Sequence, residues 1–166
     1  MSITSLQEEV ALALQDVKDP EIPSVSIGEL GMIYSINVTE PNVHIELLPT
    51  FVGCPALGII EKNVIHAVED KVEWVDGVTV SYVYDISWSS DRISQEGRHK
   101  LKEYGIAPPP ENFKEGDKWE VACPYCGSPY TSMENIFGPA ACRSILYCKS
   151  CRNPFEALKP IASHNN

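Results

Sequence analysis

The two segments Cys123-Pro124-Tyr125-Cys126 and Cys148-Lys149-Ser150-Cys151 decide the fold of the C-terminal part of this chain. Each segment has C-x2-C spacing, so two side chains on one tight turn can point at a common ion. The segments are 21 residues apart, and together they form a closed cage of four thiolates. Gly127 follows the first pair, where such a knuckle often needs a permissive backbone. The spacing predicts a structural metal site with zinc as the expected metal.

The spacing alone leaves other states of these cysteines open. Iron can be held by the same four thiolates. Two disulfides or four ordinary thiols are the remaining alternatives. A further cysteine, Cys142, lies between the two pairs. It could replace a ligand or take part in metal handling, but a complete set of four favours a structural or redox-idle role.

Length and composition limit the rest of the chain. It has 166 residues, of which 43% are hydrophobic, enough for one ordinary domain and a small appendage. The first ten residues, MSITSLQEEV, contain neither a basic nor an apolar region of the kind that a secretory signal needs. No apolar run is long enough to span a membrane. Six cysteines without an export signal predict a cytoplasmic protein with metal ligands and not a disulfide framework.

The net charge of −10 is unevenly distributed. Residues 1–91 contain 15 acidic side chains and 3 lysines, whereas residues 119–166 contain 3 acidic and 4 basic side chains. An acidic body repels phosphate backbones, so we expect no nucleic-acid partner. The acidity either attracts a basic protein partner or only maintains solubility.

Hydrophobic periodicity predicts an N-terminal α+β domain. Ser5 and Glu8 have capping-box spacing, and the helix that they begin ends at Asp19-Pro20. Alternating strands follow over 32–39, 43–47 and 78–86. A second helix begins after Cys54 with Pro55 in its first turn, and a third ends at Gly105. The order α-β-β-α-β-α indicates a small mixed sheet with helices on one face.

We expect three parts along the chain: a domain over 1–105, a proline-rich linker over 106–118, and a zinc ribbon over 119–166. Three consecutive prolines make the linker stiff. Short strands are expected in the ribbon near 130–137, 144–147 and 155–158. So small a module cannot hold a core unaided, so the metal should contribute to its folding.

Three motifs in the first domain occur together. They are Asp19-Pro20-Glu21-Ile22-Pro23, the segment SIGELGMI over 26–33, and Thr50-x-x-x-Cys54-Pro55. In this order they resemble the MIP18 family (DUF59), whose members act in iron–sulfur protein assembly. The resemblance covers about residues 5–90 and implies a role in handling iron–sulfur clusters.

The longer arrangement resembles the PaaD family of phenylacetate degradation. It adds Trp88-Ser89-Ser90-Asp91-Arg92-Ile93, the Cys-Pro-Tyr-Cys-Gly knuckle, and FGPAAC over 137–142. PaaD proteins are encoded with a multicomponent phenylacetyl-CoA 1,2-epoxidase. The resemblance implies a non-enzymatic accessory factor that helps assemble an iron–sulfur or di-iron centre in the oxygenase or reductase component. The alternative is a structural or regulatory subunit that transfers no metal.

Cys54 is the candidate for metal or cluster transfer. It lies where a loop becomes a helix, and backbone N–H groups and the helix dipole lower a thiol pKa there. Thr50 could hydrogen-bond this loop or the sulfur. Taken alone, such a cysteine is more often a small buried hydrophobe. With the resemblance, Cys54 is expected to be an exchangeable ligand of a transient iron–sulfur cluster, with Glu21 or Asp19 as an oxygen ligand.

One cysteine per chain holds a cluster poorly, so we expect Cys54 to share it. The second set of ligands would come from a client protein or from a second copy of the chain. A thiol-dependent enzyme is the weakest hypothesis, because no histidine has motif-level pairing with Cys54.

Overall fold

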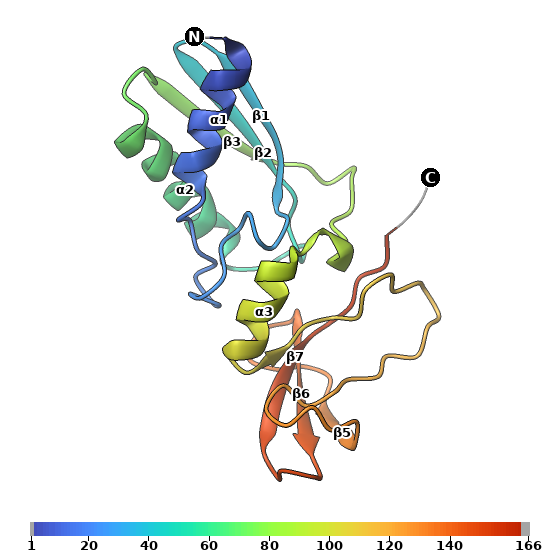
Figure 1. Cartoon of the computed structure of the whole chain (residues 1–166). Coiled ribbons are helices and arrows are strands. Elements are labelled where there is room, and N and C mark those ends of the chain that lie inside the picture. The colour runs from blue at the N-terminus through green and yellow to red at the C-terminus, as the bar shows by residue number, and fades with distance from the viewer. Residues whose placement is uncertain (1, 164–166) are drawn as a thin grey trace. The chain divides into compact units, whose positions relative to one another are not determined.

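The computed structural model describes residues 2–163 and divides the chain into two compact units. The N-terminal unit comprises Met1–Pro49 and Pro55–Ile86. The C-terminal unit comprises Thr50–Cys54 and Ser87–Asn166. Figure 1 traces the elements along the chain. The predicted α+β fold class is confirmed, because the chain combines helices with a three-stranded and a four-stranded sheet.

Two helices, α1 (Ile3–Leu14) and α2 (Leu57–Lys71), form the helical layer of the N-terminal unit. They contact each other, and both lie on one face of the sheet (Figure 1). Their apolar stripes have helical spacing, which turns these side chains towards the core. The buried residues of the two helices are Leu6, Val10, Ala13, Leu14, Ile60, Val64 and Val68.

The sheet of this unit has the order β1-β2-β3 and is mixed. Strand β1 (Ile33–Thr39) pairs antiparallel with β2 (Asn42–Leu47), and β2 pairs parallel with β3 (Gly77–Tyr82). A parallel pair needs a long crossover connection, and α2 supplies it. The central strand β2 buries every second residue, so this face of the sheet packs under the helices.

An irregularity in β1 corrects the predicted alternation. The sequence pattern places Met32, Tyr34 and Ile36 on one face of a strand. In the structure Ile33 pairs with Leu47, while Ile36 pairs with Ile45, and the register shifts between them. Tyr34 is the extra residue and is exposed. A bulge of this kind moves the residues before it to the other face.

The C-terminal unit has a short 3-10 helix η1 (Ser90–Arg92), helix α3 (Gln95–Glu103) and a second sheet. The strands of that sheet are β4 (Ile106–Ala107), β5 (Thr131–Asn135), β6 (Arg143–Cys148) and β7 (Pro154–Leu158). Their order is β4-β7-β6-β5. Strands β5, β6 and β7 run antiparallel, whereas β4 pairs parallel with β7.

The predicted linker over 106–118 begins too early. Ile106 and Ala107 are buried and pair with Glu156 and Ala157 of the ribbon. Only two residues separate Gly105 from a run of prolines, which is too few to show the apolar–polar alternation of a strand. No local sequence pattern therefore predicts this strand. The remaining boundaries of the three predicted parts stay predictions.

The structure also corrects the predicted starts of two helices. The first helix begins at Ile3, and Ser2 caps it by accepting the Ser5 backbone N–H at 3.3 Å, so the Ser5–Glu8 capping box is wrong. The second helix begins at Leu57, after Ala56 and not at Pro55. Among the described residues, no helix combines the length and apolar character that crossing a membrane requires.

Candidate metal centre

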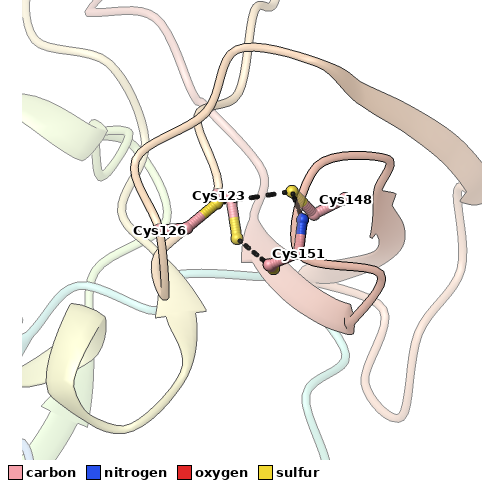
Figure 2. A group of neighbouring side chains, drawn as sticks. All are labelled: Cys123, Cys126, Cys148 and Cys151. Atoms are coloured by element: carbon pink, nitrogen blue, oxygen red, sulfur yellow. Dashed lines mark hydrogen bonds between the residues drawn. The ribbon is translucent and has the colours of Figure 1, made fainter.

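The four cysteines of the two C-x2-C segments converge at one place (Figure 2). Their sulfur atoms all lie within 4.8 Å of one another. The sulfurs of Cys123 and Cys151 are 3.7 Å apart, and those of Cys126 and Cys148 are 3.6 Å apart. A tetrahedral ion with metal–sulfur bonds of about 2.3 Å requires sulfur–sulfur edges of about 3.8 Å. A disulfide needs about 2.05 Å, so these two sulfur pairs have the spacing of ligands to a shared ion.

The two knuckles have matching backbone geometry. In the first, Gly127 has a φ of +75° and donates its N–H to the Cys123 carbonyl at 2.8 Å. In the second, Arg152 has a φ of +62° and donates its N–H to the Cys148 carbonyl at 2.9 Å. The predicted need for a permissive residue at Gly127 is confirmed. Arg152 occupies the equivalent position in the second knuckle. A non-glycine residue rarely adopts a positive φ, so the sequence of this knuckle does not predict the turn.

A hydroxyl pair links the knuckles outside the sulfur group. The side-chain oxygens of Ser128 and Ser150 lie 2.7 Å apart. Each serine lies in or beside a different knuckle, so this bond holds the two turns together independently of the sulfurs. Sequence reasoning missed this pair, because two single serines carry no spacing pattern.

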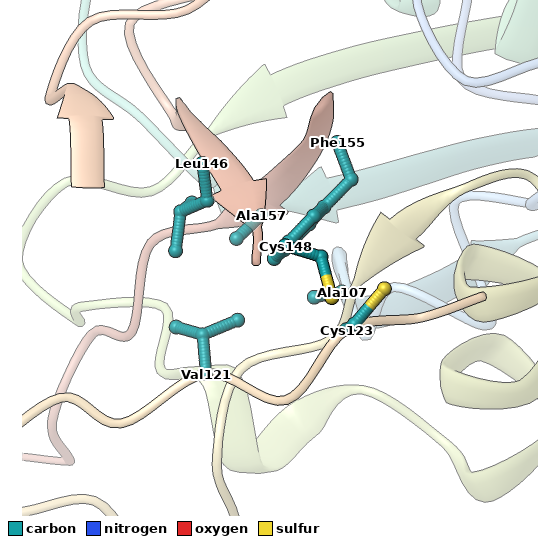
Figure 3. Close-up of a cluster of buried hydrophobic side chains, with 7 residues drawn as sticks. All are labelled: Ala107, Val121, Cys123, Leu146, Cys148, Phe155 and Ala157. Carbon is teal, nitrogen blue, oxygen red and sulfur yellow. The ribbon is translucent and has the colours of Figure 1, made fainter. Parts of the chain in front are cut away.

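The sulfurs rest on a small apolar core (Figure 3). Cys123 and Cys148 are buried in it, whereas Cys126 is exposed and Cys151 is half-buried. One side of the site is therefore held by packing, and the other side faces solvent. The other buried members of this core are Ala107, Val121, Leu146, Phe155 and Ala157.

Backbone donors favour a thiolate at Cys148. The Cys151 N–H points at the Cys148 sulfur from 3.5 Å, and this bond is the main cause that lowers the pKa of Cys148 to about 6. At Cys126 the Ser128 backbone lowers the pKa, but desolvation of the sulfur by its surroundings and the neighbouring sulfurs outweigh it and raise the pKa to about 11. Opposite shifts are expected where a thiol donates to an adjacent thiolate.

The donor set fits a structural metal ion. Four sulfurs at ligand spacing form a complete tetrahedral set with no position for a substrate. Thiolates are soft ligands that suit zinc or iron and do not suit magnesium or calcium. Within residues 2–163, this is the one group of three or more histidine, cysteine or acidic side chains whose ligand atoms come this close together.

Cys142 lies outside this group. It is half-buried in the loop before β6, and its carbonyl accepts the Lys159 N–H at 2.9 Å. The structure therefore gives the four-sulfur set without using the fifth ribbon cysteine. Its role as a structural or metal-handling residue stays a prediction.

The residues of the second predicted site are divided between the two units. Asp19 and Glu21 belong to the N-terminal unit, whereas Thr50 and Cys54 belong to the C-terminal unit. The Asp19 carboxylate accepts the backbone N–H of Glu21 at 2.7 Å and that of Ile22 at 3.2 Å, so it shapes its own loop. Their combination into one site stays a prediction.

Cys54 itself lies in a turn. It is half-buried, and its N–H donates to the Phe51 carbonyl at 3.2 Å. Helix α2 begins three residues later, at Leu57, which places Cys54 farther from the helix N-terminus than the sequence pattern suggests. The effect of the helix on this thiol stays a prediction.

Comparison with protein families divides the chain in a similar way. Residues 7–82 match the model of an iron–sulfur cluster assembly protein. Residues 107–159 match the model of the PaaD zinc beta ribbon domain, which begins at β4. The fold and the four-sulfur site thus define a class of protein that joins an assembly-type α+β domain to a zinc ribbon.

One relative extends over both parts. It is an Escherichia coli (strain K12) protein named as the D component of a putative 1,2-phenylacetyl-CoA epoxidase, and it is 33% identical over 156 residues, covering 92% of each chain. This chain belongs to the same family, the PaaD family with an N-terminal MIP18/DUF59 domain.

Other relatives match the N-terminal part. The Fe-S protein maturation auxiliary factor YitW of Bacillus subtilis (strain 168) is 35% identical, over 58% of this chain and 94% of its own length. The crystal structure of a DUF59 domain from Bacillus anthracis is similar with a TM-score of 0.56 and 29% identity, over 59% of this chain and 92% of that one.

Proposed function

We propose that this protein is a maturation factor of the phenylacetate degradation pathway. It helps to assemble an iron–sulfur or di-iron centre in the multicomponent phenylacetyl-CoA 1,2-epoxidase and does not itself catalyse epoxidation. One observation carries the proposal: a chain similar to an epoxidase component along 92% of its length begins with an iron–sulfur assembly domain over residues 7–82.

In this proposal the ribbon is the structural half. Cys123, Cys126, Cys148 and Cys151 hold one zinc ion, which supplies folding energy by joining the two knuckles. The closed ligand set is the support for this role, because it leaves no open position for chemistry. Iron at the same four sulfurs is the alternative that metal analysis tests.

The transfer half is the loop that carries Cys54. A thiolate at Cys54 acts as a soft, exchangeable ligand for a cluster that is the protein's cargo. Glu21 or Asp19 supplies an oxygen ligand or tunes the cysteine's proton, and Thr50 supports the loop. Release is a ligand exchange in which a thiolate of the client takes the place of Cys54. The client is the oxygenase or the reductase component of the epoxidase.

The test is co-expression with the epoxidase components under anaerobic conditions. Cys54→Ser should lower the iron and acid-labile sulfide that the purified components contain. Cys142→Ser removes another half-buried thiol; unchanged iron and sulfide in this variant would confine the transfer role to Cys54, and a loss would assign Cys142 to metal handling as well.

The measurement also separates the proposal from the scaffold alternative. A structural or regulatory subunit would support full metal content and epoxidase activity without Cys54. Normal loading of the epoxidase with Cys54→Ser, while the variant keeps its ribbon metal, would therefore replace maturation with scaffolding.

A further inference from the structure

We infer that metal binding in the ribbon orders the loop that carries Cys54, through a bracing segment that we define as residues 87–107. All of this segment except Ala107 lies between the two family matches in sequence. It nevertheless belongs to the same compact unit as the ribbon, and so does Thr50–Cys54. The inference concerns how the proposed transfer site is regulated, and its importance for maturation rests on the proposed function.

One end of the bracing segment is bonded to the chain that leaves the ribbon. The Ser90 N–H donates to the Ile161 carbonyl at 3.0 Å, and the Ser90 hydroxyl donates to the same carbonyl at 2.9 Å. The Ile161 N–H donates back to the Ser90 hydroxyl at 3.0 Å. Three bonds at one serine make a specific link between η1 and the residues after β7.

Arg98 of α3 holds the middle of the segment. Its side chain is buried and donates to the Ser90 carbonyl at 2.9 Å and to the Pro109 carbonyl. The N–H groups of a buried guanidinium need such hydrogen-bond partners. Arg98 therefore ties α3 both to the Ser90 link and to the chain that follows β4.

The other end of the segment touches the metal knuckle. Ala107 of β4 shares a buried cluster with Cys123 and Cys148 (Figure 3). Gly105 ends α3 beside the first knuckle, and a Cβ at Gly105 would lie 2.6 Å from the Tyr125 hydroxyl oxygen. Gly105 and strand β4 therefore lie against the two knuckles that the metal joins.

These contacts give metal binding an effect beyond the ribbon. Four-cysteine modules of this size depend on their metal for folding. When the knuckles separate, the cluster around Cys148 opens and β4 loses its support on β7. The bracing segment then loses protection, and the Thr50–Cys54 loop, which belongs to the same compact unit, loses order with it. The metal-bound ribbon holds Cys54 in place, and the metal-free ribbon releases it.

Amide exchange measured by mass spectrometry on the full-length protein tests this coupling. The reduced protein is compared with its zinc bound and after zinc is removed by a chelator. Removal should accelerate exchange roughly tenfold or more in α3, β4 and the Thr50–Cys54 loop. Strand β2 of the N-terminal unit is the internal control and should not change.

Two results would overturn the inference. One is unchanged exchange in α3 and in the loop when β6 has lost its protection. The other is unchanged exchange in β6 itself, because the metal would then not hold the ribbon. The Cys54→Ser variant should respond to zinc removal as the parent does, so a failed maturation test does not affect this result.

A variant with its zinc retained tests the link itself. Ser90→Ala removes two of the three bonds to Ile161 and should increase exchange and alkylation in the Thr50–Cys54 loop several-fold, with zinc still bound. Ser132→Ala makes the same change at a serine on β5 whose hydroxyl bonds only locally, to the exposed Glu134, and it should have no effect. Equal exchange of the Thr50–Cys54 loop in the two variants would show that the bonds between Ser90 and Ile161 do not affect the order of this loop.

Discussion

Replacing Gly105 with alanine should destabilise the C-terminal unit by about 1–2 kcal/mol, the cost of a left-handed conformation for a residue with a Cβ. Gly105 has a φ of +90° at the end of α3. The new Cβ would also meet the Tyr125 hydroxyl oxygen at 2.6 Å. Tyr125 is 58% exposed and can move its ring away, so the backbone conformation should account for most of the loss.

Gly58→Ala is the matched control. Gly58 lies in α2, and a Cβ added there would meet nothing within 4 Å. Alanine is the better helix former, so this variant should be more stable than the parent by about 0.5 kcal/mol. Replacing glycine with alanine is thus expected to lower the free energy of unfolding at Gly105 and to raise it at Gly58.

Native-state amide exchange of α3, with zinc bound, measures the effect in the unit that contains Gly105. A loss of one or two kcal/mol corresponds to roughly 5- to 30-fold faster exchange through opening of this unit. Unchanged exchange in Gly105→Ala would refute the assignment of strain to the backbone. Full recovery in the double variant Gly105→Ala with Tyr125→Phe would show instead that the clash with the hydroxyl dominates.

Three further predictions, two of them with a control variant, test the site and the core. Cys148→Ser should abolish stoichiometric zinc binding, whereas Cys142→Ser should retain one zinc per chain in metal analysis. Leu14→Ala removes a fully buried side chain and should cost about 2–5 kcal/mol in urea unfolding; Leu12→Ala, at a residue that is 61% exposed, should stay within about 0.5 kcal/mol. Arg152→Gly relieves the positive φ of the second knuckle and should raise the midpoint of unfolding with zinc bound; a lower midpoint would show that the arginine side chain stabilises the turn.

Local patterns predicted that the two helices of the N-terminal unit exist and which of their faces is buried, because their apolar residues have helical spacing and a core to face. The ends of the helices were wrong: α1 ends at Leu14 and not at Asp19. Local patterns failed where contacts with other residues decide the register of a strand or the start of a helix. The bulge at Tyr34 depends on which residues of β2 pair with β1. The early start of α1 depends on the Ser2 cap, although Ser5 and Glu8 also have capping spacing.

The metal site shows the same division. C-x2-C spacing is a local property, so the four ligands follow from the chain alone, and the structure brings their sulfurs within 4.8 Å. The positive φ at Arg152 and the Ser128–Ser150 bond have no comparable pattern. They result from closing the second turn against the first.

The sequence by itself determined the class of protein: an acidic α+β domain with assembly motifs, followed by a module with a four-cysteine site. These features depend on periodicity, spacing and motif order, which are properties of neighbours along the chain. The tertiary structure alone decided that β4 joins the ribbon sheet and that residues 87–107 and Thr50–Cys54 belong to the ribbon's unit. For β4 the physical reason is that Ile106 and Ala107 are buried and pair with Glu156 and Ala157 of the ribbon. For the segment before it, the backbone N–H and the hydroxyl of Ser90 are satisfied by the carbonyl of Ile161, which is far away in sequence.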